Sequence, residues 1–194
     1  MRNLLKPAIP TSTGIIYKET EPWMVAVLRS TGKHDNKLVL PGGKVKVGHH
    51  NWLQTLIIEA KEEVNMTDLK MISFFCTGSK VLRDVRIMKM KYYLDGNPKP
   101  DNIPCIDEEK TLVEGYHAFD MVFTAASNSE PVADGIEGKE AFYVDVNNVN
   151  PDDYALDHGH MLVAYAHYLK TGNKPALDQF SHVSCVCTLS ENRE

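Results

Sequence analysis

The sequence predicts an α/β protein in which a mixed β-sheet is packed between α-helices. Short apolar segments of strand-like composition alternate with two longer segments in which apolar residues recur at helical spacing. Elements in this order bury their apolar faces in layers, with helices against a sheet. At 194 residues and 43% hydrophobic content, the chain is long enough for one domain with a sizeable core.

The predicted elements follow one another along the chain with polar or glycine-rich connections. Strands are expected at residues 14–17, 23–29, 38–40, 70–75, 85–94 and 142–146, and a closing helix at residues 158–169, stopped by Gly172. Residues 95–114 are rich in Pro, Gly, Asp and Glu and are predicted to be a long loop. A loop of this length is often functional, as a lid or as a dimer contact, and the sequence leaves both roles open.

The first helix is predicted over residues 52–64. Its apolar residues repeat at helical spacing and are Leu53, Leu56, Ile57, Ala60 and Val64. Asn51 is a suitable N-cap, and Asn65 can take the left-handed conformation that ends a helix.

Three carboxylates occupy positions i, i+3 and i+4 of this helix: Glu59, Glu62 and Glu63. They project from one face beside the apolar stripe and are therefore expected at its solvent-facing rim. A glycine turn, Pro41-Gly42-Gly43, stands just upstream, where backbone oxygens can approach the same point. Oxygen ligands of this kind hold Mg²⁺ against a polyphosphate. An acidic helix face that only carries solvated charge, in an interaction protein, is the alternative.

These residues resemble the signature of the Nudix hydrolases, which reads G, five residues, E, seven residues, then R-E-U-x-E-E-x-G-U, with U a bulky aliphatic residue. The matching positions are Gly43, Glu59, Glu62, Glu63 and Met66. The chain departs from the signature where the first glutamate falls on His49 or His50, and at Ile58 (arginine in the signature), Ala60 (aliphatic) and Asn65 (glycine).

The resemblance extends beyond the motif to about residues 13–171. The apolar run at 38–40 enters the glycine turn as the family's strand does, residues 117–125 resemble its central strand, and residues 157–169 are similar to its last helix. The resemblance implies the Nudix fold for a single domain at residues 13–174. An N-terminal extension at residues 1–12 and a C-terminal tail at residues 175–194 would flank it.

The resemblance also implies a reaction, the hydrolysis of a nucleoside diphosphate linked to another group by metal-assisted attack of water on phosphorus. The three helix glutamates would be catalytic and, with the carbonyl of Gly43, would hold Mg²⁺, with Mn²⁺ as a substitute. Members often add an acidic residue before a late strand. Glu140 is the best placed here and Glu137 is the runner-up.

Basic residues near the glycine turn are the candidates for binding a phosphorylated substrate: Arg29, Lys44 and Lys46. The signature arginine pairs with a motif glutamate in the family, and Ile58 cannot do this. Loss of such a partner typically costs ~10 to 100-fold in activity or metal affinity. A slow or narrow-specificity hydrolase and a nucleotide-binding sensor or scaffold are thus the two alternatives. Nucleoside triphosphates, dinucleoside polyphosphates, nucleotide sugars and capped RNA ends all stay open as substrates.

Charge and apolar patterning limit the classes of binding partner and the cellular compartment that we expect for this protein. A formal net charge of -5 argues against a broad basic surface and therefore against duplex nucleic acid as a partner. The sequence has no apolar run of membrane-spanning length and no secretory signal at residues 1–10, so a cytoplasmic protein without a membrane partner is expected. Cys185 and Cys187, with His182, can bind a soft metal or belong to a polar tail. A homodimer is left open.

Overall fold

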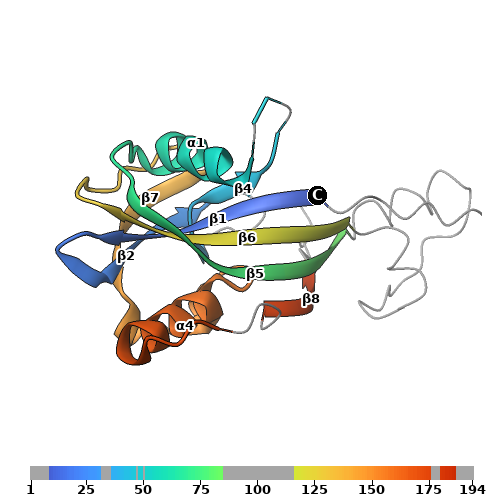
Figure 1. The fold of residues 1–194 in the computed structure, drawn as a ribbon. Coiled ribbons are helices and arrows are strands. Elements are labelled where there is room, and N and C mark those ends of the chain that lie inside the picture. The colour runs from blue at the N-terminus through green and yellow to red at the C-terminus, as the bar shows by residue number, and fades with distance from the viewer. Residues whose placement is uncertain are drawn as a thin grey trace, which may run out of the picture.

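A computed structural model describes residues 9–31, 36–46, 48–49, 51–84, 116–175 and 180–186. The predicted strand 85–94, the predicted loop 95–114, His50 and Cys187 lie outside these residues. The described residues form one mixed sheet with α1 (Trp52–Val64) on one face and α4 (His158–Thr171) on the other (Figure 1). The predicted fold class is therefore confirmed.

The sheet combines parallel and antiparallel pairs. Its strands are β1 (Ile9–Lys18), β2 (Glu21–Ser30), β3 (Leu38–Val39), β4 (Gly42–Lys44), β5 (Lys70–Asp84), β6 (Tyr116–Ser127), β7 (Gly138–Asp145) and β8 (Phe180–Val186). The strand order is β3-β2-β1-β6-β5-β8, with β4 paired to β1 and β7 paired to β2. The pairs β1–β6 and β5–β8 are parallel, whereas β4 and β2 run antiparallel to β1. The 3-10 turns η2 (Val146–Asn148) and η3 (Pro151–Asp153) lead from β7 to α4.

Helix α1 has the bounds that the sequence predicts. The Asn51 side chain accepts a hydrogen bond from the backbone N–H of Gln54 at 2.8 Å, and Asn65 ends the helix with a left-handed φ of 54°. Both ends are thus set by local chemistry that the sequence displays.

The structure differs from the sequence-based boundaries at both ends of the domain. Strand β1 begins at Ile9 because it pairs with β6 from that residue onward. Residues 180–186, predicted as part of a tail, form β8 beside β5, and Cys185 lies on this strand. Val146, predicted as a strand residue, begins η2. Partners distant in sequence decide such boundaries, so local composition does not reveal them.

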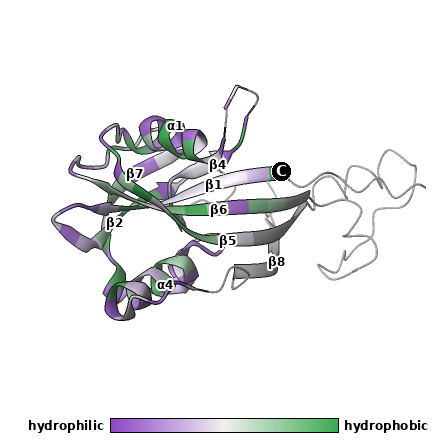
Figure 2. Ribbon diagram, in the orientation of Figure 1, coloured by the Kyte–Doolittle hydropathy of each residue, from purple (hydrophilic) through white to green (hydrophobic). Residues whose placement is uncertain are grey.

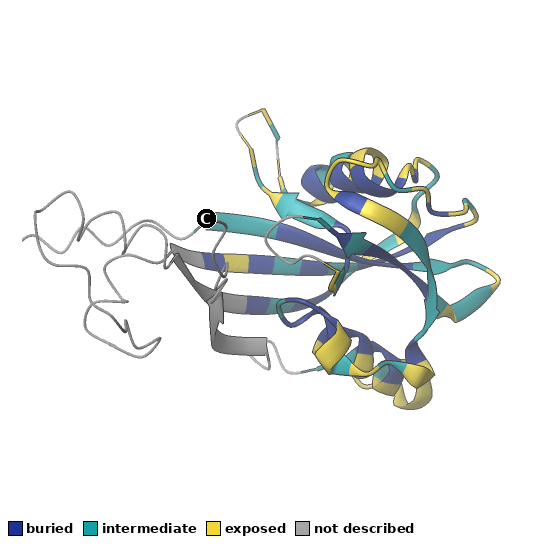
Figure 3. Cartoon of the chain, turned by 180° about the vertical axis from the view of Figure 1, so that it is seen from behind, coloured by how far each residue is buried: buried dark blue, intermediate teal, exposed yellow. Residues whose placement is uncertain are grey.

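Side chains alternate between the two faces of the sheet, as strand geometry requires. On β1, Ile15 packs in the core under α4 and Ile16 packs in the core under α1. Hydrophobic segments occur along the sheet strands and on both helices (Figure 2), and buried residues are found on the same elements (Figure 3). Leu53 and Ile57 of the predicted apolar stripe of α1 are nevertheless exposed. No helix among the described residues is long and apolar enough to cross a membrane.

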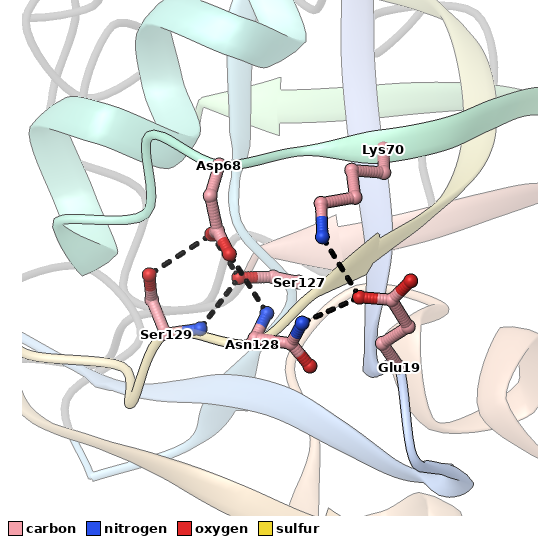
Figure 4. A network of polar contacts seen from close by, with 6 residues as sticks. All are labelled: Glu19, Asp68, Lys70, Ser127, Asn128 and Ser129. Carbon is pink, nitrogen blue, oxygen red and sulfur yellow. Dashed lines mark hydrogen bonds and ion pairs between the residues drawn. The ribbon is translucent and has the colours of Figure 1, made fainter.

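A polar network joins the chain after α1 to the end of β6 (Figure 4). The Asp68 carboxylate accepts hydrogen bonds from the Ser127 hydroxyl, from the Asn128 N–H at 2.9 Å and from the Ser129 hydroxyl at 2.9 Å. Chiefly through the bond from Ser127, this arrangement lowers the pKa of Asp68 to about 2. The network therefore holds the C-terminal end of α1 against the sheet through a charged group.

Replacing Asp68 with asparagine is expected to lower the free energy of unfolding by about 1 kcal/mol at pH 7, a value reduced for the group's exposure to solvent. Because the folded pKa lies below the unfolded value of 3.8, the contribution is complete above pH 4 and disappears as the pH falls to about 2. Melting curves of wild type and Asp68→Asn between pH 2 and pH 7 measure it. A stability difference that persists at pH 2 would contradict this account, and Asp152→Asn is the matched control.

Candidate functional site

The glycine turn and helix α1 meet at β4, which pairs with β1. The Gly42 N–H donates a hydrogen bond to Glu63 Oε2 at 2.8 Å. A Cβ atom added at Gly43 would lie 2.5 Å from the carboxylate carbon of Glu59, so only glycine permits this approach. Backbone and carboxylate groups that the sequence predicts to converge are thus brought together.

Two contacts fix the chain that enters this turn. The Leu40 N–H donates to the Nδ1 atom of the buried His158 at 2.9 Å, which ties the turn to the first residue of α4. The Gly14 N–H donates to the Pro41 carbonyl at 2.8 Å, which ties it to β1. The glycine turn is therefore attached to both α4 and β1.

All three helix glutamates were expected at the solvent-facing rim, and only Glu62 lies there. Its side chain is 58% exposed, whereas Glu59 and Glu63 are 4% and 8% exposed, and for these two the expectation was wrong. Strand β4 covers one side of them. The segment before β7 runs beside the C-terminal end of α1, since Val132 N–H donates to the Val64 carbonyl and Asp134 N–H donates to the Glu63 carbonyl.

Lys46 supplies the positive charge at this cluster. Its Nζ atom lies 3.1 Å from Glu59 Oε1 and 3.9 Å from Glu62 Oε2. The ion pair with Glu59, together with attraction from Glu62 and Glu137, raises the pKa of Lys46. Of the predicted substrate-binding cations, Lys46 contacts the glutamates and Lys44 is exposed on β4.

Glu137, the runner-up, is the late acidic residue that lies beside the helix glutamates. Burial, first of all, raises the pKa of the Glu63 carboxyl to about 8, and the charges of Glu59 and Glu137 and a hydrogen bond with Glu137 act in the same direction. The Gly42 N–H opposes this rise. Asp134 places Glu137, because its carboxylate accepts the N–H groups of residues 136–138 before β7 begins.

The structure does not bring Glu140 and Arg29 to the helix glutamates. They face each other across the β2–β7 pair, with Arg29 Nε 3.2 Å from Glu140 Oε2. Side chains two residues apart on a strand point to the same face. Arg29 therefore points to the same face as Val27, and Glu140 to the same face as Phe142, and both of these residues pack in the core under α4. They therefore lie on the sheet face opposite α1.

The structure also places residues that depart from the family signature. His49 Nδ1 lies 2.9 Å from the Thr55 hydroxyl and 3.4 Å from the Lys46 N–H, so His49 supports the loop that carries Lys46. Ile58 is half-buried.

Sequence reasoning missed Ser12, whose hydroxyl is fully buried on β1 and has no hydrogen-bond partner among the described residues. Residues 12–16 of β1 are all buried, and a single serine in a strand carries no sequence signal for this.

The donor atoms of the cluster fit a hard divalent cation in chemical type. They are carboxylate oxygens beside a glycine backbone, the ligands that Mg²⁺ prefers. Among the described residues, however, no three acidic, histidine or cysteine side chains stand close enough together to hold a metal ion as they are placed. Glu59 and Glu62 instead share the ammonium group of Lys46.

No protein-family model matches the sequence, and no curated protein matches it. Solved structures match the fold. The NUDIX domain of Shewanella oneidensis NrtR complexed with ADP ribose is 14% identical with a TM-score of 0.59, over 88% of this chain and 94% of that chain. A NUDIX hydrolase from Nitrosomonas europaea is 15% identical with a TM-score of 0.57, over 93% of this chain and 80% of that chain. The chain has the Nudix fold.

A third neighbour in fold is a C. elegans Ap4A hydrolase in a binary complex, 14% identical with a TM-score of 0.52, over 84% of this chain and 98% of that chain. The Nudix fold is thus assigned from the arrangement of strands and helices, because the sequence identities are low. Function has to be argued from the residues of the site, because one fold hosts many functions.

Proposed function

We propose that the protein is a Nudix-type hydrolase that cleaves a pyrophosphate bond in a nucleoside diphosphate linked to another moiety. The observation that carries this proposal is the register of Glu59, Glu62 and Glu63 on α1, against the glycine turn, in a chain with the Nudix fold. Two of the fold neighbours are described with ADP ribose and with Ap4A hydrolysis, and both of those compounds contain phosphoanhydride bonds.

The helix glutamates, with the backbone of Gly43, would hold the metal ion in this proposal. Bound Mg²⁺ would neutralise charge on the diphosphate and lower the pKa of the attacking water. Glu137 replaces Glu140 as the proposed proton acceptor, because Glu137 lies beside Glu63 whereas Glu140 pairs with Arg29. Lys46, which contacts the carboxylates, and Lys44, which is exposed on β4, are the proposed phosphate-binding cations. Catalysis would then depend mainly on positioning and electrostatics.

A nucleotide sensor with little turnover is the second candidate. The observation that favours it is the state of the carboxylates, which bind Lys46 and one another rather than standing around a ready cation site in the described part of the chain. A sensor would bind nucleotide and metal without releasing products.

Product release separates these functions. We would incubate the wild-type protein with nucleoside triphosphates, dinucleoside polyphosphates and nucleotide sugars, with Mg²⁺ or Mn²⁺, and quantify phosphate and nucleotides. Metal-dependent release is expected, and it would identify the substrate class. Saturating ligand also raises the melting temperature, by a free energy of about 2.7 kcal/mol at 100 times Kd. Stabilisation without release would establish the sensor, and the absence of both would indicate an acidic-helix interaction protein.

A further inference from the structure

We propose that Lys46 is a built-in counter-ion of the glutamate cluster, and that a divalent cation must displace its ammonium group in order to bind. The inference rests on the proposed function, because it concerns the cation site of that function. It explains why carboxylates of the right type stand together without forming a ready metal site.

The contacts of Lys46 make it a competitor for the same oxygens. Its ammonium group lies 3.1 Å from Glu59 Oε1 and 3.9 Å from Glu62 Oε2, and it is attracted by Glu137. A divalent ion bound to these oxygens would repel the ammonium group strongly at such short separations in a partly buried site. The two cations are therefore alternatives, and lysine occupancy reduces the apparent affinity for the metal.

Exposure shows which of the partners can move. The Lys46 side chain is 56% exposed, whereas the Glu59 side chain that it neutralises is only 5% exposed. The lysine reaches the buried carboxylate from the solvent side, and its flexible stem can swing out without opening the core. The Glu59 carboxylate is packed against Gly43 and therefore has less room to move than the ammonium group.

The backbone of Lys46 is attached to the start of α1. The His49 N–H donates to the Lys46 carbonyl at 3.0 Å, and His49 Nδ1 contacts the Thr55 hydroxyl of the helix. A displaced ammonium group therefore remains near the carboxylates. It would be available there to a phosphate of the substrate, so one lysine would serve the metal-free and the loaded states in turn.

Ser12 is an independent sign that the lysine-bound arrangement is not the only one this site adopts. Ser12 lies opposite Gly43 in the β1–β4 register, on the α1 face that it shares with Ile16, and the Glu59 carboxylate rests on Gly43 at that face. Its buried hydroxyl has no partner in the described structure. Buried hydroxyl groups normally find hydrogen bonds, and a cation with its bound water at Glu59 would offer one.

Mn²⁺ binding without nucleotide tests the proposal. Titration followed by electron paramagnetic resonance or calorimetry compares the wild type with Lys46→Met and with Lys170→Met, which removes the same charge from an exposed position at the end of α4, on the other face of the sheet. Lys46→Met is expected to bind Mn²⁺ about tenfold more tightly, because the competent state is no longer depleted by the lysine. Lys170→Met should stay within about twofold of the wild type. Lys46→Met should also melt at a lower temperature without metal and gain more from added Mn²⁺.

The outcomes separate this inference from the proposed function. Equal or weaker Mn²⁺ binding by Lys46→Met, with binding that is still lost in Glu63→Gln, would overturn the counter-ion role and leave the cation site intact. Lys46 would then be a positioning residue for Glu59. Absence of Mn²⁺ binding in the wild type and every variant would overturn the cation site itself. Lys46→Gln, which keeps a hydrogen-bond donor, replaces Lys46→Met if the latter fails to fold.

Discussion

Replacing Glu63 with glutamine is expected to reduce hydrolysis at least ~100-fold while the protein stays folded. The glutamine oxygen can still accept the hydrogen bond that Gly42 N–H makes to Glu63 at 2.8 Å. Burial raises the pKa of this carboxyl to about 8 in the metal-free protein, so a neutral side chain is compatible with its surroundings. What the variant loses is a negatively charged ligand for the cation. Product release and melting temperature, measured together, check both halves of this expectation.

Two further variants give this experiment its controls. Glu62→Gln removes an exposed member of the cluster and should also lose activity, with no change in melting temperature, because its side chain has little packing to lose. Glu130→Gln removes a charge from an exposed side chain outside the cluster and should keep wild-type turnover. Full activity in Glu63→Gln, or its unfolding, would count against the assigned site.

Gly43→Ala is expected to have the second largest effect, again on activity rather than on stability. The added methyl group would meet the Glu59 carboxylate at 2.5 Å, and this flexible end of a side chain can shift at small cost to the fold. A shift of even ~1 Å in a catalytic group typically costs on the order of 100-fold in rate. We therefore expect turnover to fall by about that factor with a nearly unchanged melting temperature.

Gly42→Ala is the matched comparison for this prediction. Its methyl group would meet backbone atoms, the Ser12 carbonyl oxygen at 2.3 Å and the Thr13 Cα at 2.8 Å, and backbone cannot move without disturbing the β1–β4 pairing. This variant should lose about 2 kcal/mol or more of stability. If both glycine variants lower stability equally and leave turnover per folded molecule unchanged, the proposed contact between Gly43 and Glu59 has no catalytic role.

Local signals predicted part of the fold well. The bounds of α1 followed from its apolar spacing and from Asn51 and Asn65, since capping and periodicity act over one or two turns of helix. Strands β1, β2, β5, β6 and β7 were predicted in place but too short, β3 was predicted one residue too long, and β4 and β8 were not predicted as strands. Their lengths depend on backbone partners such as β6 for β1 and β5 for β8, which lie far away in the sequence.

The candidate site, too, was predicted from the sequence only in its local features. By itself, the sequence determined that Glu59, Glu62 and Glu63 share one helix face and that glycines precede them, because both features are local. Only the tertiary structure decided that Glu137 rather than Glu140 joins them, and that Lys46 is the cation they bind. The physical reason is that strand register and side-chain parity, set by pairings distant in sequence, determine which face of the sheet a side chain reaches.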